Sequence, residues 1–178
     1  MTNNNIYFIA NWKMFGSVKL VNSLNNIISY SKKNKQKAKI VYCPPYTLLK
    51  SFIDKTKNSN IEIGAQDCHI NSDYGPYTGA ISSKMIKDLG AKFVIIGHSE
   101  TREENDNKKI NLKIKSALNK KLNVVFCVGE KLIDKKKNKT KFVLKKQLLE
   151  GLKNLNKLNN VIIAYEPVWS IGTGIIPT

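Results

Sequence analysis

The chain has 178 residues, an apolar fraction of 42% and a formal net charge of +17 at pH 7. That composition is enough for one buried core and excludes a disordered chain. The sequence shows no signal peptide and no apolar run of roughly 18 to 20 residues, so we expect a cytoplasmic protein without a membrane contact. Nearly all of the positive charge is lysine, Arg102 being the only arginine, and lysine is the poorer residue for bidentate recognition of phosphates and bases, so we expect no nucleic-acid partner.

Short β-branched runs alternate with longer segments of helical period along the chain. The first pair is a predicted strand at 6–10 and an amphipathic segment that carries Leu20, Leu24, Ile27 and Ile28. Five more strands are predicted, at 39–43, 61–64, 92–96, 123–128 and 161–165. Two helical faces with lysines opposite precede the last two strands, namely Ile110, Ile114, Ala117 and Leu118, then Leu144, Leu148, Leu152 and Leu155.

Strands that are apolar on both faces and joined by helical crossovers predict a parallel α/β sheet, either doubly wound or closed into a barrel. The pattern alone does not separate these two. A complete eight-stranded barrel takes about 250 residues, and this chain stops soon after its sixth predicted strand. We therefore expect residues 1–178 to form a single incomplete domain of six strands and five helices, with the last two strand–helix units absent and with open edges that favour aggregation.

Polar side chains follow the first and fourth strands, at the end of a parallel sheet where ligands bind. Asn11 and Lys13 are two residues apart on a segment expected to be extended, so both side chains can point at one centre and stabilise a negatively charged oxygen. His98 precedes Ser99 and Glu100, which suit the start of a helical turn whose dipoles favour a neutral imidazole. Taken alone, each of these motifs is more often structural.

Glu166 follows the sixth strand and precedes a segment with Pro167 and Pro177 at its ends and Gly172 and Gly174 between them. A carboxylate under a closing loop suits a general base, because the loss of water raises its basicity. The prolines restrict φ at the ends of the loop, and the glycines leave backbone N–H groups free to approach an anion. A Gly-Thr-Gly sequence by itself is more often only a turn.

The remaining residues that could carry chemistry are given structural interpretations. Cys43, Cys68 and Cys127 are widely separated, which predicts neither a disulfide framework nor a zinc site and fits a reducing compartment. His69 is interpreted as a structural histidine. The densest lysine runs, at 32–37 and 135–139, contain no aromatic residue for base stacking and are interpreted as solvated surface.

Four segments together resemble signatures of the triosephosphate isomerase family, and they occur in the family's order. They are Asn11-Trp12-Lys13-Met14, Gly97-His98-Ser99-Glu100, Cys127-Val128-Gly129-Glu130 and Ala164-Tyr165-Glu166-Pro167-Val168-Trp169. The resemblance covers the whole chain. It implies a (β/α)8 TIM barrel, truncated here after the sixth strand and its loop, and an isomerase of glycolysis and gluconeogenesis that interconverts dihydroxyacetone phosphate and D-glyceraldehyde 3-phosphate through an enediolate.

The resemblance also implies a role for each catalytic residue. Glu166 moves the proton between two substrate carbons, His98 and Asn11 serve the enediolate oxygens, and Lys13 supplies positive charge. The family is itself a standard example of a glutamate base that works beside a neutral histidine. No cofactor and no metal are implied.

Supporting residues are implied by the same resemblance. Ser99 matches a serine that contacts the base, Glu100 a glutamate close to the catalytic lysine and histidine, and Gly172 a donor to the substrate phosphate. Thr78 and Gly79 belong to the family's third loop, which docks into a neighbouring subunit, so a homodimer is expected of the full-length protein.

The chain departs from the family pattern at Thr101, where an arginine is common, and at 175–177, where Ile-Ile-Pro replaces a frequent Lys-Thr-Ala hinge; we expect altered loop kinetics at most. Two family turns that supply most phosphate-binding N–H groups lie beyond residue 178, so we expect the chain alone to be nearly inactive. Two alternatives stay open, namely another phosphosugar enzyme on the same fold and a polyanion-binding protein with a vestigial site.

Overall fold

The computed structural model describes residues 6–33 and 38–176. Within them, six strands form one sheet, and each strand pairs in parallel with the next strand along the chain. The strands are β1 (Tyr7–Asn11), β2 (Lys39–Cys43), β3 (Ile61–Ala65), β4 (Phe93–Ile96), β5 (Asn123–Val128) and β6 (Val161–Tyr165). A doubly wound sheet reverses its strand order at a switch point, and this sheet does not. The structure therefore decides for the barrel, of which the six strands form an open part.

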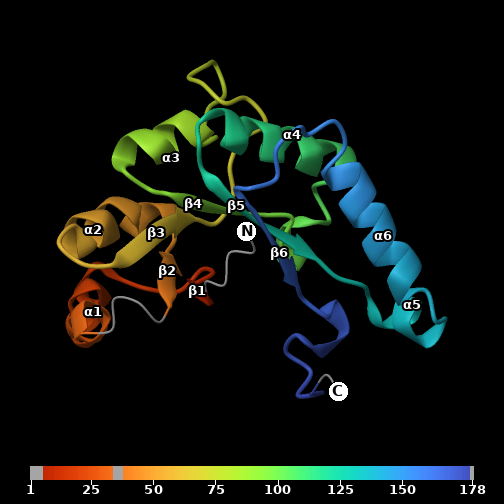
Figure 1. Cartoon of the computed structure of the whole chain (residues 1–178), viewed down its shortest axis with the longest axis horizontal. Coiled ribbons are helices and arrows are strands. Elements are labelled where there is room, and N and C mark those ends of the chain that lie inside the picture. Colours follow the sequence, from red (N-terminus) through yellow and green to blue (C-terminus); the bar gives the residue numbers. More distant parts are fainter. Residues whose placement is uncertain (1–5, 34–37, 177–178) are drawn as a thin grey trace.

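Helices cover the convex side of the curved sheet (Figure 1). They are α1 (Leu24–Lys33), α2 (Tyr46–Thr56), α3 (Ser83–Leu89), α4 (Asn107–Asn119), α5 (Leu132–Lys136) and α6 (Thr140–Gly151), with short 3₁₀ turns at Val18–Ser23, Ser99–Thr101 and Val168–Ser170. The described chain thus has six α-helices where the sequence predicted five. The extra helix arises because Asn138, with a φ of 55°, turns the chain between α5 and α6.

Two of the predicted helical faces need correction at their ends. Leu20 lies in a 3₁₀ turn and is 47% exposed, because α1 begins only at Leu24. Leu152 and Leu155 lie beyond the end of α6, although both still pack against the core. The face on α4 is confirmed as predicted, with Ile110 among its fully buried side chains.

The apolar core has two layers, one on each face of the sheet. The larger layer lies between the strands and the helices and includes Phe52, Ile114 and Phe126. The smaller layer lies on the concave face and is built from Val41, Cys43, Phe93, Ile95, Val125 and Cys127. Burial on both faces explains why the strands are apolar along their whole length.

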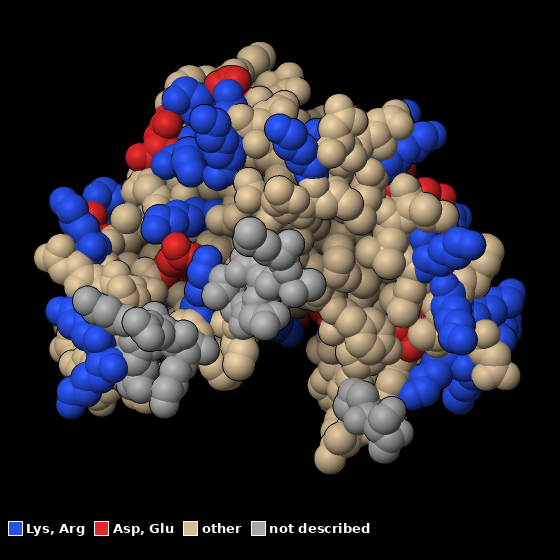
Figure 2. Space-filling view, in the orientation of Figure 1, with Lys and Arg blue, Asp and Glu red and all other residues tan. Residues whose placement is uncertain are grey.

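Charge and apolar surface are distributed unevenly over the outside of the molecule. Figure 2 shows lysine side chains spread over the helical surface, as expected for a solvated charged face. The edge strands carry exposed apolar side chains instead, with Phe8 on β1 at 63% exposure and Tyr165 on β6 at 52%. In the described residues, no helix has the length and apolar character that a membrane crossing needs.

Helix α6 packs tightly against the sheet at Gly151, its last residue. A Cβ atom added there would lie 2.4 Å from Cζ of Phe126, whose ring is fully buried. A Gly→Ala change in a helix is normally stabilising by about 1 kcal/mol. Here we expect Gly151→Ala to lower the free energy of unfolding by about 1–3 kcal/mol, because overpacking a rigid core costs more than propensity gains. Urea unfolding followed by circular dichroism measures this difference.

A double-mutant cycle with Phe126→Leu provides the control, because the smaller side chain leaves room for the added methyl group. In that background Gly151→Ala should cost clearly less than in the wild type. A stabilising effect of Gly151→Ala in the wild-type chain would contradict the packing described here.

Candidate active site

The predicted catalytic residues meet at the carboxyl ends of three strands. Asn11 is the last residue of β1, His98 lies two residues beyond β4, and Glu166 lies one residue beyond β6. Backbone hydrogen bonds continue past the strand ends, since the Glu166 N–H donates to the Val128 carbonyl at 2.9 Å. The position of the carboxylate is therefore fixed by sheet pairing and not by a free loop.

The backbone conformation at Lys13 differs from the one that the sequence suggested. The segment was expected to be extended through Lys13, but β1 ends at Asn11 and Lys13 has a φ of 51°, in the left-handed region. The Asn11 side-chain oxygen accepts the Lys13 N–H at 2.9 Å, and the Gln66 amide donates to the Lys13 carbonyl at 2.9 Å. These two bonds hold a backbone conformation that a lysine rarely adopts.

His98 is held in a defined orientation by the backbone that follows it. Its Nδ1 accepts the Glu100 N–H at 3.2 Å, and its side chain is only 13% exposed. Because Nδ1 acts as an acceptor, a neutral imidazole carries its proton on Nε2. Nε2 lies 3.3 Å from Oε2 of Glu166, so this N–H points into the site.

Glu166 is held by three polar contacts in this conformation. Its Oε1 accepts the Ser99 N–H at 2.6 Å, and its Oε2 lies 3.4 Å from Ser99 Oγ and 3.3 Å from His98 Nε2. The side chain is 16% exposed, so little water competes for these contacts. Ser99 therefore lies against the carboxylate that the sequence predicted to be the base.

Glu100 links the histidine to the lysine. Its carboxylate lies 2.8 Å from the Lys13 ammonium and 3.6 Å from His98 Nδ1. The Glu100 side chain is 54% exposed, so this ion pair positions the lysine but adds little to stability. The structure thus brings Asn11, Lys13, His98, Glu100 and Glu166 together in one connected cluster.

The backbone behind Glu166 is packed too closely for any side chain. A Cβ at Gly129 would lie 1.8 Å from the Glu166 carbonyl oxygen, which explains the glycine. The Gln147 side chain both accepts the Gly129 N–H and donates to its carbonyl, each at 2.9 Å. Arg102 donates to the Cys127 carbonyl at 2.9 Å on the other side. The sequence analysis missed Gln66 and Gln147, and only the position of Gln66 just after β3 signalled a role.

The segment after Glu166, residues 167–176, is called the lid segment below. Gly172 and Gly174 have φ values of 71° and 72°, and a Cβ at either position would meet no atom within 4 Å. Ile176 is 82% exposed. The lid segment therefore stands away from the catalytic cluster, and Pro177, the second predicted hinge proline, lies outside the described residues.

The start of the lid segment is anchored in a buried polar network. Trp169 is 7% exposed, and its indole N–H donates to the Glu130 carboxylate at 2.9 Å. Glu130 is 1% exposed and also lies within 3.2 Å of the Tyr165 hydroxyl and 3.3 Å of Thr140 Oγ1. The glutamate of the Cys-Val-Gly-Glu segment thus has three hydrogen-bonding partners, which are Trp169, Tyr165 and Thr140.

Thr78 and Gly79, the expected interface residues, lie exposed in the loop that spans 66–82. The loop projects from the molecule on the side opposite to the lid segment in Figure 1. It is braced internally, because the His69 ring packs 4.6 Å from the Tyr77 ring and the His69 N–H donates to the Ile81 carbonyl. His69 thus has the structural role that the sequence suggested. The loop contacts the catalytic cluster of its own chain at its first residue, where Gln66 donates to the Lys13 carbonyl.

The cluster combines a shielded carboxylate, an imidazole and an ammonium group around one space. A carboxylate of this kind can take a proton from carbon, and the two donors can stabilise the negative charge that forms on an adjacent oxygen. The arrangement supports proton transfer next to a carbonyl group.

Comparisons with known proteins agree with this chemistry. Residues 6–178 match the family model described as triosephosphate isomerase. The triosephosphate isomerase of Dictyoglomus thermophilum is 46% identical over 170 residues, which cover 93% of this chain and 68% of that protein. The enzyme from the Wolbachia of Brugia malayi is 42% identical over 174 residues, covering 96% and 70%. The crystal structure of triosephosphate isomerase from Bartonella henselae superposes with a TM-score of 0.85 at 38% identity, covering 93% of this chain and 69% of that one.

The thiol behind the carboxylate makes the stability of the chain depend on pH. The pKa of Cys127 is raised from 9.0 to about 12, chiefly by burial and also by the Glu166 charge, while the Arg102 charge lowers it. The unfolded thiol ionises first, so its contribution to stability is complete below pH 9.0 and is lost as the pH rises toward about 12. Between these values the wild type should lose up to about 1.4 kcal/mol per pH unit relative to Cys127→Ser. Urea unfolding of both proteins at several alkaline pH values measures the difference, and parallel curves would contradict it.

Proposed function

Because the chain belongs to the triosephosphate isomerase family, we propose that this cluster carries out the interconversion of dihydroxyacetone phosphate and D-glyceraldehyde 3-phosphate. The observation that carries the assignment of residues is the contact of Glu166 with His98 Nε2 at 3.3 Å, at the meeting point of two strand ends. The isomerase is favoured over another phosphosugar enzyme on the same fold because the match to the family covers residues 6–178, which include Glu166 and the lid glycines.

Glu166 is the base in this proposal. It removes a proton from one substrate carbon, holds it as a carboxylic acid and returns it to the neighbouring carbon. The Ser99 N–H holds Glu166 Oε1 at 2.6 Å, outside the reacting position. Giving up this bond when substrate binds frees the carboxylate to reach the substrate carbon.

His98, Lys13 and Asn11 stabilise the enediolate formed by that proton transfer. The Nε2–H of His98 faces the site because Nδ1 is occupied by a backbone N–H, so it can donate to the developing oxyanion and recover its proton. Lys13 adds positive charge, and Glu100 holds its ammonium group at 2.8 Å. Asn11 serves the second oxygen and shapes the Lys13 backbone. The reaction proposed here uses no cofactor and no metal.

The lid segment is proposed to close over the substrate, with the Gly172 N–H donating to its phosphate. The chain spans about two thirds of the length of the relatives named above. Binding energy from a remote phosphate is used for orientation and closure, so we expect the 178-residue chain alone to turn over slowly. Its place is proposed to be the cytoplasm, as an enzyme of glycolysis and gluconeogenesis.

A homodimer of the full-length protein is also proposed. Met14 and Phe15 follow Lys13 and are 96% and 74% exposed, which is the kind of apolar surface that marks a subunit interface. The exposed tip at Thr78 and Gly79 supplies a second, separate surface. We propose that the 66–82 loop of one subunit covers the Lys13 turn of the other.

The test of the isomerase assignment uses a fusion protein, in which this chain is joined to the last two strand–helix units of the Dictyoglomus thermophilum relative. Coupled assays in both directions should show fast turnover, and Glu166→Asp should reduce kcat by about 10²- to 10⁴-fold, because the shorter side chain misplaces the base. Glu104→Asp, the same change at an exposed position, serves as the matched control and should leave kcat unchanged. A folded fusion protein without turnover would sink the assignment and favour polyanion binding, which would weaken steeply with salt.

The dimer is tested by Met14→Lys in the same fusion protein. Because Met14 is 96% exposed in the single chain, the substitution should leave the fold unchanged but place a charge in the proposed interface, shifting the dimer to monomer. Sedimentation equilibrium measures the mass, and Phe142→Lys on α6, where the side chain is 67% exposed, is the control that should remain dimeric. A monomeric wild-type fusion protein, or a dimeric Met14→Lys variant, would overturn the proposed interface.

A further inference from the structure

The indole of Trp169 contacts two groups of opposite charge, one at its edge and one over its face. Its N–H edge donates to the Glu130 carboxylate at 2.9 Å, and its face is covered by the Lys135 ammonium, 3.1 Å from the ring centroid. An ammonium over an indole face is attracted by the electron-rich ring, and indole is the best of the aromatic side chains for this contact. Trp169 is therefore held by charge and hydrogen bonding as well as by burial.

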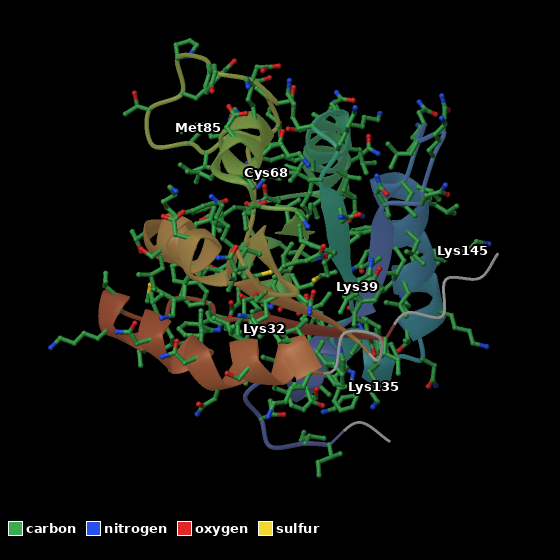
Figure 3. The ribbon with its side chains drawn as sticks, turned by 60° about the vertical axis from the view of Figure 1, so that its left-hand side comes forward. Lys32, Lys39, Cys68, Met85, Lys135 and Lys145 are labelled. Atoms are coloured by element: carbon green, nitrogen blue, oxygen red, sulfur yellow. The ribbon has the colours of Figure 1, made fainter. Side chains whose placement is uncertain are left out.

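The hydrogen bond to Glu130 and the cation–π contact with Lys135 come from residues of very different burial. Glu130 is 1% exposed and is fixed by further contacts with Tyr165 and Thr140, so it belongs to the rigid body of the molecule. Lys135 lies on the short helix α5 and is exposed apart from its contact with the ring. Figure 3 labels Lys135, together with Lys145 on the neighbouring helix α6. From the 131–139 segment, Lys135 places its ammonium group over the Trp169 ring at the start of the lid segment.

We propose that Lys135 is a positioning residue of the lid, acting through Trp169. The lid segment leaves the body of the protein at Trp169, and beyond it Gly172 and Gly174 meet no neighbouring atom. The cation over the indole stabilises the arrangement in which the lid stands away from the catalytic cluster. Without that contact, Trp169 keeps its burial and its bond to Glu130 but loses one electrostatic contact, and the lid samples other positions more often. This inference rests on the proposed function, because it takes residues 167–176 to be an active-site lid.

The contact itself is read by fluorine NMR of this chain labelled with 5-fluorotryptophan. The chain has two tryptophans, so two signals are expected, and Trp169→Phe identifies which signal belongs to the lid. Lys135→Met keeps most of the side-chain volume but removes the charge, and it should shift the Trp169 signal while leaving the Trp12 signal in place. Lys135→Arg should restore the wild-type position, because a guanidinium also stacks on an indole face.

The effect on the lid is read by amide hydrogen exchange of residues 170–176 in the same proteins. Lys135→Met should speed this exchange about two- to fivefold, the range that a cation–π contact of an exposed lysine supplies. Lys136→Met, the same change at the next position of α5, is the matched control and should affect neither readout. An unchanged Trp169 signal, unchanged lid exchange, or an equal effect of Lys136→Met would each overturn the proposal.

Neither readout depends on turnover. A chain that failed every isomerase assay could still show the Lys135 effect, and an active enzyme could lack it. The two proposals therefore fail separately.

Discussion

Parallel pairing of the strands in chain order is the constraint on which the site depends. Each strand adds to the edge left by the one before it, so all carboxyl ends arrive at the same rim. Pairing continues beyond the formal strand ends, where the Trp12 N–H reaches the Cys43 carbonyl and the Glu166 N–H reaches the Val128 carbonyl. A slip of one residue in the β5–β6 register would turn Glu166 to the other face. The reacting groups are therefore placed by the same hydrogen bonds that hold the sheet together.

Positive and negative charges lie in different parts of the molecule. The net charge of +17 is carried largely by lysines outside, whereas Glu130 and Glu166 lie at the rim with 1% and 16% exposure. Each buried carboxylate is matched by donors, Glu166 by Ser99 and His98 and Glu130 by Trp169 and its neighbours. Positive charge at a distance raises the local concentration of an anionic triose phosphate, while His98 Nε2 supplies a hydrogen-bond donor within the site. The long-range field and the local chemistry thus use different residues.

Much of this architecture could be predicted from the sequence, because residues close together in the chain determine where strands end and which helical faces are apolar. All six strands lie within about a residue or two of their predicted bounds. Asn11, Lys13, His98 and Glu166 stood out as polar residues near strand ends, but only the resemblance to the family joined them into one site. The split of the last crossover into α5 and α6 was missed, since it depends on a left-handed asparagine with no strong local signal. Gln66 and Gln147 were missed because their roles come from contacts with backbone groups distant in sequence, and single glutamines carry no pattern. The left-handed Lys13 was missed because its strain is held by tertiary hydrogen bonds.

The open sheet separates two parts of catalysis that a closed barrel combines. Proton transfer and oxyanion stabilisation use groups from β1, β4 and β6, and these meet within the described residues. Binding of a remote phosphate needs N–H donors on the part of the rim between β6 and β1. The edges of these two strands are exposed, with Phe8 on β1 and Tyr165 on β6 facing outward. The lid segment begins beside the rim, where the Trp169 indole N–H donates to the Glu130 carboxylate. Because remote binding energy draws a lid closed and orders the reacting groups, closure of the lid and proton transfer at the rim depend on each other. Trp169 is the residue at which the lid segment joins the part of the fold that carries the base and its donors.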